Sequence, residues 1–287
     1  MPTNKVQLRS IEETMSDYTP IYQPIYPLLL GKSQAYSEEV GNIDFKRVST
    51  VGDIRARQVT PKDTEIRQIA VGESKKSFKK YFLANQFTLS ALQDREGVED
   101  VVAQVLDEHQ KQMDEIILLG EGTSNGTVLN NGLFWSGDAN HVTESAGADI
   151  ATGDSGLVDM HGRVMSNVAD ADDLSGRKLI LFYGDASKKL GSLYSASNSP
   201  FKGVLEESLG ANYSVAKIPK AITPASSHGW IVVNLDQVKL HYTALPSLKA
   251  QGVNEEKMYA WFNFLMGSAM VEVLAPGAVI RQPVTFA

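Results

Sequence analysis

The five histidines are the residues best suited to metal binding or acid–base chemistry, and their spacing favours neither. They form no His-Glu-x-x-His or similar ligand pattern. Without a cysteine, the chain also has no thiolate zinc ligand, no cysteine nucleophile and no disulfide. We therefore predict no catalytic residue, no cofactor and no metal site, and we expect a protein that is not an enzyme. The histidines are His109, His141, His161, His228 and His241.

The only close cluster of carboxylates consists of Asp170, Asp172 and Asp173, in a segment that has the pattern of a loop. Carboxylate oxygens are hard ligands that suit Ca²⁺ or Mg²⁺, so a cation site is one interpretation. A solvated acidic loop without a ligand is the other, and it is the simpler of the two.

The glycine-rich segment Gly120–Gly126 is superficially similar to a nucleotide-binding loop. A loop of that kind follows a strand and opens a helix, so that backbone amides at the start of the helix face the phosphate. Here the glycines follow a predicted helix and lead into an apolar segment. Gly120 suits the end of that helix, and the remaining residues suit tight turns.

The chain of 287 residues carries a net charge of -7, and this charge is unevenly placed. The segment from Lys46 to Lys80 sums to +6, which leaves -13 for the rest of the chain. An acidic protein is poorly suited to general nucleic-acid binding, whereas oppositely charged regions can attract each other between copies. There is no run of about eighteen apolar residues and no signal-like start, so we expect a protein kept in a cytoplasm.

Three kinds of segment precede the middle of the chain. The proline-rich stretch Tyr18–Leu30 predicts an extended arm that must pack on its own body or on a neighbour. Residues 43–82 predict a long β-hairpin with limbs at Phe45–Val51 and Glu65–Val71 and a tip near Val59–Asp63. Apolar residues at steps of three and four predict a helix over Leu89–Leu119, with Gly97 as a point where it could kink.

The second half alternates between helical and strand-like patterns, which predicts an α+β domain. Helices are expected at Leu157–Val168, Ala186–Leu193 and Gly203–Leu209, and strands at Arg177–Tyr183, Gly229–Asn234 and Val238–Tyr242. The apolar, strand-forming stretch from Lys257 to Leu274, followed by Pro276–Ile280, is expected to return and pack against the long helix.

This order of elements resembles the tailed-phage major capsid proteins of the HK97 fold. The residues that carry the resemblance are the arm, the basic extended loop, the helix ending in Leu118-Leu-Gly-Glu-Gly, the Asn131-Gly-Leu-Phe turn and the closing Met270-Val-Glu-Val-Leu-Ala-Pro-Gly-Ala-Val279 segment. The resemblance implies an amino-terminal arm over residues 1–40, an extended loop (E-loop) over 41–82, a peripheral domain with a spine helix over 83–145 and 251–287, and an axial domain over 146–250.

The implied function is a structural shell protein that assembles as hexamers and pentamers into an icosahedral capsid around double-stranded DNA. Scaffolding, portal and decoration proteins are the implied partners, contact with DNA is expected to be weak and nonspecific, and the implied location is the virion, after assembly in the host cytoplasm. The residues expected at the assembly interface belong to the arm and the basic loop: Tyr22, Tyr26, Arg55, Arg57, Lys62 and Arg67.

The resemblance leaves some features and two alternatives open. Some relatives carry a long amino-terminal scaffolding segment, whereas this arm begins almost at Met1, so scaffolding would come from a separate protein or the chain is already processed. Some relatives crosslink a lysine to an asparagine; Lys62 is a conceivable donor, but no residue identifies itself as the acceptor. An encapsulin-like compartment shell and a cytoplasmic metal- or nucleotide-dependent enzyme are the alternative functions.

Overall fold

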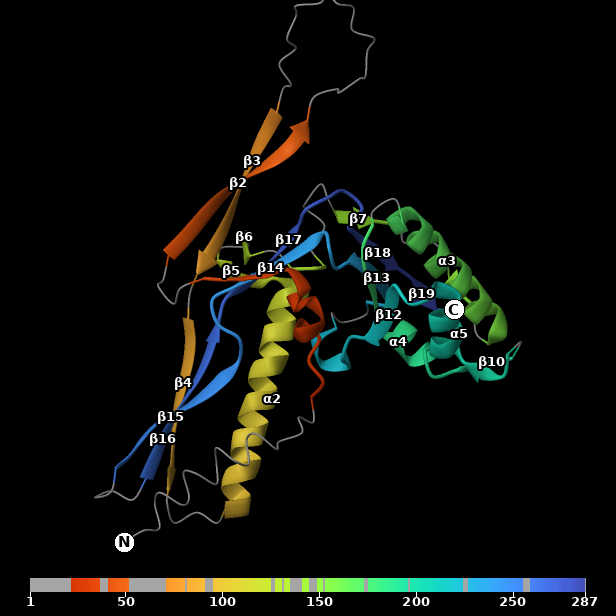
Figure 1. Ribbon diagram of the computed structural model, residues 1–287. Helices are drawn as coiled ribbons and strands as arrows, with labels where there is room; N and C mark the ends of the chain where they lie inside the picture. The colour runs from red at the N-terminus through yellow and green to blue at the C-terminus, as the bar shows by residue number, and fades with distance from the viewer. Residues whose placement is uncertain are drawn as a thin grey trace, which may run out of the picture.

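Helices and several sheets alternate along the chain, as the sequence pattern predicts. The computed structural model (Figure 1) describes residues 22–36, 41–51, 71–80, 82–90, 95–124, 127–130, 132–134, 141–144, 149–151, 153–172, 175–195, 197–223, 227–254 and 259–286. No helix in this described part has the length and apolar character needed to cross a bilayer.

A five-stranded sheet lies at the centre of the molecule, with both faces covered. Every residue of β9 and β13, two of its three interior strands, is buried, which explains why these strands are continuous apolar runs in the sequence. β9 pairs with β12 in parallel and with β13 antiparallel, while β18 pairs antiparallel with β13 and in parallel with β7. The strands in sheet order are β12 (Tyr213–Lys217), β9 (Lys178–Tyr183), β13 (Gly229–Asn234), β18 (Val279–Pro283) and β7 (His141–Thr143).

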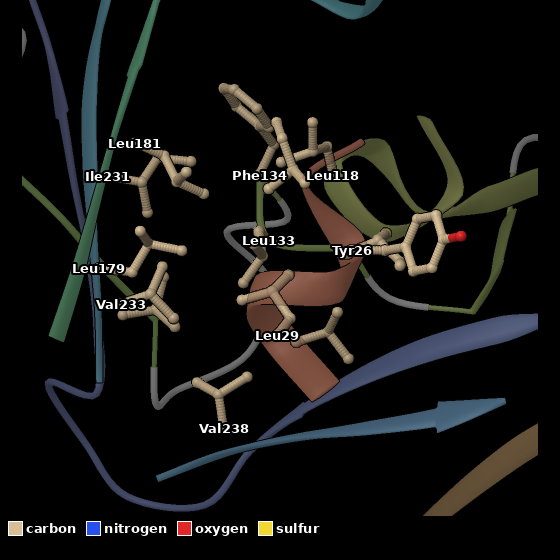
Figure 2. Packing of buried hydrophobic residues seen from close by; sticks show 14 of the residues in the cluster. Tyr26, Leu29, Leu118, Leu133, Phe134, Leu179, Leu181, Ile231, Val233 and Val238 are labelled. Carbon is tan, nitrogen blue, oxygen red and sulfur yellow. The ribbon is translucent and has the colours of Figure 1, made fainter. Parts of the chain in front are cut away.

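Alternate residues of this sheet enter two different hydrophobic cores. Leu179 and Leu181 of β9 face the core that contains the long helix α2, and Figure 2 shows them beside residues of the arm. Ile180 and Phe182 face the core that contains helices α3 (Asp154–Asp172) and α5 (Phe201–Leu209). The central sheet is therefore a wall that the two cores share.

Helix α2 runs from Arg95 to Leu119, which corrects the predicted start at Leu89. Leu89 lies in strand β4 (Phe82–Ser90), which pairs along its whole length with β16 (Tyr259–Gly267). The 25 residues of the helix give a length of about 37 Å at about 1.5 Å per residue. Gly97 lies in the first turn rather than at a mid-helix kink.

Two three-stranded sheets have strands that contact α2. A three-stranded sheet has the order β1-β14-β17, and a second has the order β15-β16-β4. Strands β16 and β17 both contact α2, so the predicted return of the carboxy-terminal strands to the long helix is confirmed. The bounds are β1 (Ser33–Ala35), β14 (Val238–Tyr242), β17 (Ala269–Val273) and β15 (Ser247–Asn254).

Four two-stranded pairs complete the architecture, and the largest is the hairpin of β2 (Gly41–Val51) and β3 (Val71–Lys80). This hairpin projects away from the body in Figure 1. The predicted first limb lies inside β2, whereas the predicted tip and most of the predicted second limb lie outside the described residues. The other pairs are β5 (Glu121–Ser124) with β6 (Thr127–Asn130), β10 (Leu193–Tyr194) with β11 (Ser199–Pro200), and β8 (Asp149–Ile150) with β19 (Thr285–Phe286).

The arm differs from the predicted extended backbone at its carboxy-terminal end. Residues Tyr26–Lys32 form the 3₁₀ helix η1, with Pro27 in its first turn. A proline is tolerated there because the first amides of a helix lack an internal partner in any case. The helix contacts α2 and strand β14, and Tyr26 and Leu29 are buried in the core that these elements share (Figure 2).

The helices and the longer strands predicted in the middle segment are present, with differences at helix ends and in the short elements. Helix α4 (Asp185–Lys189) ends earlier than predicted, because Leu193 already belongs to strand β10. The sequence did not predict strands β8, β11 and β12 or the 3₁₀ helix η2 (Lys220–Ile222). Asp170 and Asp172 lie at the end of helix α3, not in a loop, while Asp173 is outside the described residues.

Several sheets combine strands from both sides of the predicted limit at residue 250, including the β8–β19 pair. Strand β18 joins the central sheet, whose other strands all precede that residue, and strand β14 pairs with β17 from beyond it. The two segments on either side of residue 250 therefore share sheets as well as a core.

Candidate functional site

Two of the five histidines make contacts within or between helices. His109 bonds through Nδ1 to the carbonyl of Val105, and His161 contacts Ser208 across α3 and α5. Among the described residues there is no group of three His, Asp or Glu side chains that could hold a metal ion. Several buried polar contacts join the arm, α2 and the sheets.

Residues Glu121–Ser124 form strand β5 instead of the predicted tight turn, whereas Gly120 ends α2 as predicted. Gly120 ends α2 with a positive φ of 83° and donates its amide to the carbonyl of Ile116 at 2.8 Å. Gly122–Gly126 also fits the Gly-x-Ser-x-Gly pattern of serine hydrolases, which sequence reasoning overlooked. However, Ser124 ends strand β5 of the β5–β6 pair instead of standing between a strand and a helix, so it is not a nucleophile elbow.

Asp114 of α2 is the residue that holds the arm on the body. Its side chain is fully buried and accepts three hydrogen bonds from the arm. The Tyr22 hydroxyl and the Ile25 amide each donate to Oδ2 at 2.7 Å, and the Tyr26 amide donates to Oδ1 at 2.8 Å. Because two of the donors are backbone amides, the carboxylate fixes the path of the chain as well as the position of one side chain.

Burial also changes the acid–base properties of this contact. Desolvation raises the pKa of the Asp114 carboxyl above its ordinary value of 3.8, while hydrogen bonds from Ile25, Tyr22 and Tyr26 lower it in part. Burial and the neighbouring Asp114 raise the pKa of the Tyr22 phenol, so this hydroxyl stays protonated and donates. The same two causes raise the pKa of the Tyr26 phenol.

Replacing Asp114 by alanine is expected to lower the free energy of unfolding by about 3 kcal/mol, because two buried amides lose their acceptor at about 1–3 kcal/mol each. Glu115→Ala, at the exposed next position, is the control and should change it by less than about 0.5 kcal/mol. Urea unfolding of the unassembled subunit measures both changes.

A comparison of the wild type with Asp114→Ala at several pH values tests the raised pKa of Asp114. A carboxyl whose pKa is higher in the folded state contributes most below its unfolded pKa near 4 and loses that contribution as the pH rises. The stability advantage of the wild type over Asp114→Ala should therefore shrink between pH 4 and pH 7. An advantage that grows with pH would show that the hydrogen bonds, and not burial, dominate the pKa.

The end of α2 is closed by a second segment, Gly132–Phe134. The amide of Leu133 donates to the carbonyl of Ile117 at 2.9 Å, and the amide of Phe134 donates to the carbonyl of Leu118 at 2.8 Å. These bonds satisfy carbonyls that the last turn of a helix otherwise leaves open. A Cβ at Gly132 would lie 2.2 Å from the Gly120 nitrogen, so the approach of the two segments requires glycine there.

Phe134 also connects α2 to the central sheet. Its ring meets the ring of Tyr183 edge to face at 4.9 Å, and the Arg281 guanidinium lies 5.0 Å from its centre. Arg281 donates to the Tyr183 hydroxyl and to the Phe134 carbonyl, both at 3.4 Å. The turn that the sequence analysis noted at residues 131–134 thus joins the helix end to strands β9 and β18.

A second contact holds the arm on the body, at Tyr36, shortly before the hairpin begins. The Tyr36 hydroxyl lies 2.7 Å from Nδ1 of His241, and Nε2 of His241 lies 2.9 Å from Oε2 of Glu272. His241 and Glu272 are both buried, and the rings of Tyr36 and His241 stack at 5.7 Å. Burial, followed by the nearby Glu272, raises the pKa of the Tyr36 phenol. A lone glutamate in the apolar run of β17 was the sequence signal for such a buried pair.

Solved structures were compared with this arrangement. No protein-family model matches the chain, and no curated protein matches it in sequence. The capsid of Myoviridae phage XM1 superposes with a TM-score of 0.62 and 12% identity over 93% of this chain and 94% of that one. The mature capsid of bacteriophage PhiM1 gives a TM-score of 0.55 and 13% identity over 93% and 89% of the two chains.

The chain has the fold of phage capsid proteins. The capsid fold is shared with a virus-like particle from Pyrococcus furiosus, which matches with a TM-score of 0.54 and 10% identity over 96% of this chain and 98% of that one. The likeness extends over nearly the whole chain in each case, so the arm, hairpin, helix and sheets belong to one fold.

Within this capsid fold, the six residues predicted at the assembly interface fall into two groups. Tyr22 and Tyr26 pack on α2 of their own chain, where Tyr26 is buried. The four basic residues lie outside the described residues, between β2 and β3, and their role stays a prediction: Arg55, Arg57, Lys62 and Arg67.

Proposed function

We propose that this protein is a major capsid protein whose copies assemble as hexamers and pentamers into an icosahedral shell around phage double-stranded DNA. The observation that carries the proposal is the capsid fold, which extends over 93% of the chain in the match to the phage XM1 capsid. The long projecting hairpin supports it, because a two-stranded hairpin is marginally stable in water unless another surface covers it.

The parts of the chain receive roles under this proposal. Residues 1–40 are the arm, 41–82 the E-loop that reaches a neighbouring copy, 83–145 with 251–287 the peripheral domain with α2 as its spine helix, and 146–250 the axial domain at hexamer and pentamer centres. The basic E-loop meets an acidic surface of the neighbouring copy, since the rest of the chain carries the opposite net charge.

The proposed partners are scaffolding, portal and decoration proteins supplied by other chains, and the proposed location is the virion, after assembly in the host cytoplasm. Contact with DNA is weak and nonspecific in this scheme, because an acidic subunit neutralises few phosphates.

An encapsulin-like shell around protein cargo is the second candidate, and the match to the Pyrococcus furiosus virus-like particle favours it. Electron microscopy of the purified protein, with analysis of the particle contents, separates the two. Large shells that hold DNA support the capsid, and small shells that hold protein support the compartment. A stable monomer under all assembly conditions would contradict both.

Exchanging Arg55 and Arg57 for glutamate is expected to reduce the yield of shells most strongly at low salt, where charges are least screened. Light scattering during assembly at about 0.05 M and about 0.5 M salt measures the effect. Exchanging both for glutamine is the control, because it removes the charge without reversing it and should give a smaller loss. Equal yields for all three proteins would mean that these charges take no part in assembly.

A further inference from the structure

We propose that Tyr36, His241 and Glu272 form a clasp that holds the β2 limb of the hairpin at a fixed point on the body of the subunit. The clasp, and not the hairpin's own pairing, then sets the direction in which the hairpin leaves. Its effect on shells rests on the proposed function, whereas its effect on the single subunit does not.

The clasp joins three elements that are distant in sequence. Tyr36 directly follows β1, His241 lies in β14 and Glu272 in β17, and these strands are neighbours in one sheet. The Glu272 carboxylate accepts from Nε2–H of His241, which leaves Nδ1 to accept from the Tyr36 hydroxyl. With a neutral His241, each of these two hydrogen bonds therefore has one donor and one acceptor.

Apart from the clasp, the backbone at the end of the arm is held to β14 by only a few hydrogen bonds. Strand β1 has only three residues, and its pairing with β14 is extended by one bond, from the Tyr36 amide to the Tyr242 carbonyl at 2.9 Å. All three β1 residues are exposed, so apolar burial adds little there. The buried bonds of His241 strengthen the end of this strand, beside the exposed bond from Lys239 to Gln34.

The hairpin is attached to the body on both of its sides, and its strand β3 also contacts β6. On one side, β3 ends at Lys80 and β4 begins at Phe82, and β4 is held by its long ladder with β16. On the other side, Gly41 starts β2 only five residues after Tyr36, a span of at most about 18 Å. Releasing Tyr36 leaves the hairpin held on the β4 side and by the contact of β3 with β6, while its β2 limb loses its attachment.

The test uses hydrogen exchange of the unassembled full-length subunit, followed by mass spectrometry of peptides that span residues 33–51. Tyr36→Phe removes only the hydroxyl, and exchange in this segment is expected to rise about tenfold, as for the loss of one buried hydrogen bond. Tyr194→Phe is the matched control, because it removes a hydroxyl beside the other core. Exchange at the wild-type rate in Tyr36→Phe would overturn the clasp.

A second variant tests whether the three residues act as one line. Glu272→Gln does not touch Tyr36 but removes the charge that fixes the proton on Nε2 of His241. We expect a smaller rise of exchange in residues 33–51, and a double variant no faster than Tyr36→Phe alone. Fully additive effects would overturn the linkage between the two bonds.

Shell yield then tests the consequence for the hairpin. We expect Tyr36→Phe to lower the yield of closed shells while its unfolding midpoint stays near that of Tyr194→Phe. Faster exchange together with normal shells would overturn the claim that the clasp aims the hairpin. If the wild type forms no shells, the proposed function fails, while the exchange experiment still decides on the clasp.

Discussion

Closed shells are expected to disappear when residues 52–70 are replaced by Asn-Gly, while the subunit itself stays folded. Val51 and Val71 are direct register partners, so a two-residue turn of this type can join β2 to β3 without changing their pairing. The segment removed contains the four basic residues that we expect to meet a neighbouring copy. Negative-stain electron microscopy and sedimentation measure the loss of particles.

The matched control replaces the same residues by a Gly-Ser segment of equal length. It keeps the reach of the loop but removes its charge and side chains, so it should also fail to form shells. Far-UV circular dichroism should show unchanged helical content in both variants. Normal particles from the Asn-Gly variant would remove the role that we give to this loop.

Gly132→Ala is expected to lower the free energy of unfolding by about 3 kcal/mol, toward the upper end for an overpacked site. The new methyl group would lie 2.2 Å from the Gly120 nitrogen and 2.7 Å from the Leu118 carbonyl oxygen. Both atoms are backbone at the end of α2, so neither can turn away as a side chain would. Moving them breaks the bonds that Leu133 and Phe134 make to the last turn of the helix.

Gly162→Ala provides the opposite control in helix α3. A Cβ at Gly162 would meet nothing within 4 Å, and alanine is favoured over glycine inside a helix, so stability should rise by roughly 0.5–1 kcal/mol. Urea unfolding of both proteins measures the two changes. A loss below about 1 kcal/mol for Gly132→Ala would mean that residues 132–134 can shift without cost to the helix end.

Local patterns in the sequence were sufficient for elements that are regular and well bounded. The apolar run at β9 and the periodic apolar face of α3 predicted a buried strand and a helix, and both are confirmed. Gly120 predicted the end of α2 because a positive φ suits glycine. The overall resemblance to phage capsid proteins is confirmed by the structural comparison.

What the sequence missed depended on distant partners. Leu89 fits a helical period but pairs with Ala260 in a ladder, and a long-range strand partner overrides a local period. The histidines were judged by spacing along the chain, which cannot show that His241 meets Glu272 across two strands. Asp114 was not singled out in the helix pattern, because its three bonds go to residues about ninety positions away.

The shared wall of the central sheet has a mechanical consequence. Copies of one chain that occupy different places on a curved closed surface must bend to different degrees. The side chains on both faces of the central sheet are packed in two cores, and bending the sheet would disturb the packing of both. The sheet therefore resists bending. We therefore expect bending to occur mainly in the β2–β3 hairpin and the β4–β16 ladder. The part of the subunit around the central sheet is expected to stay rigid.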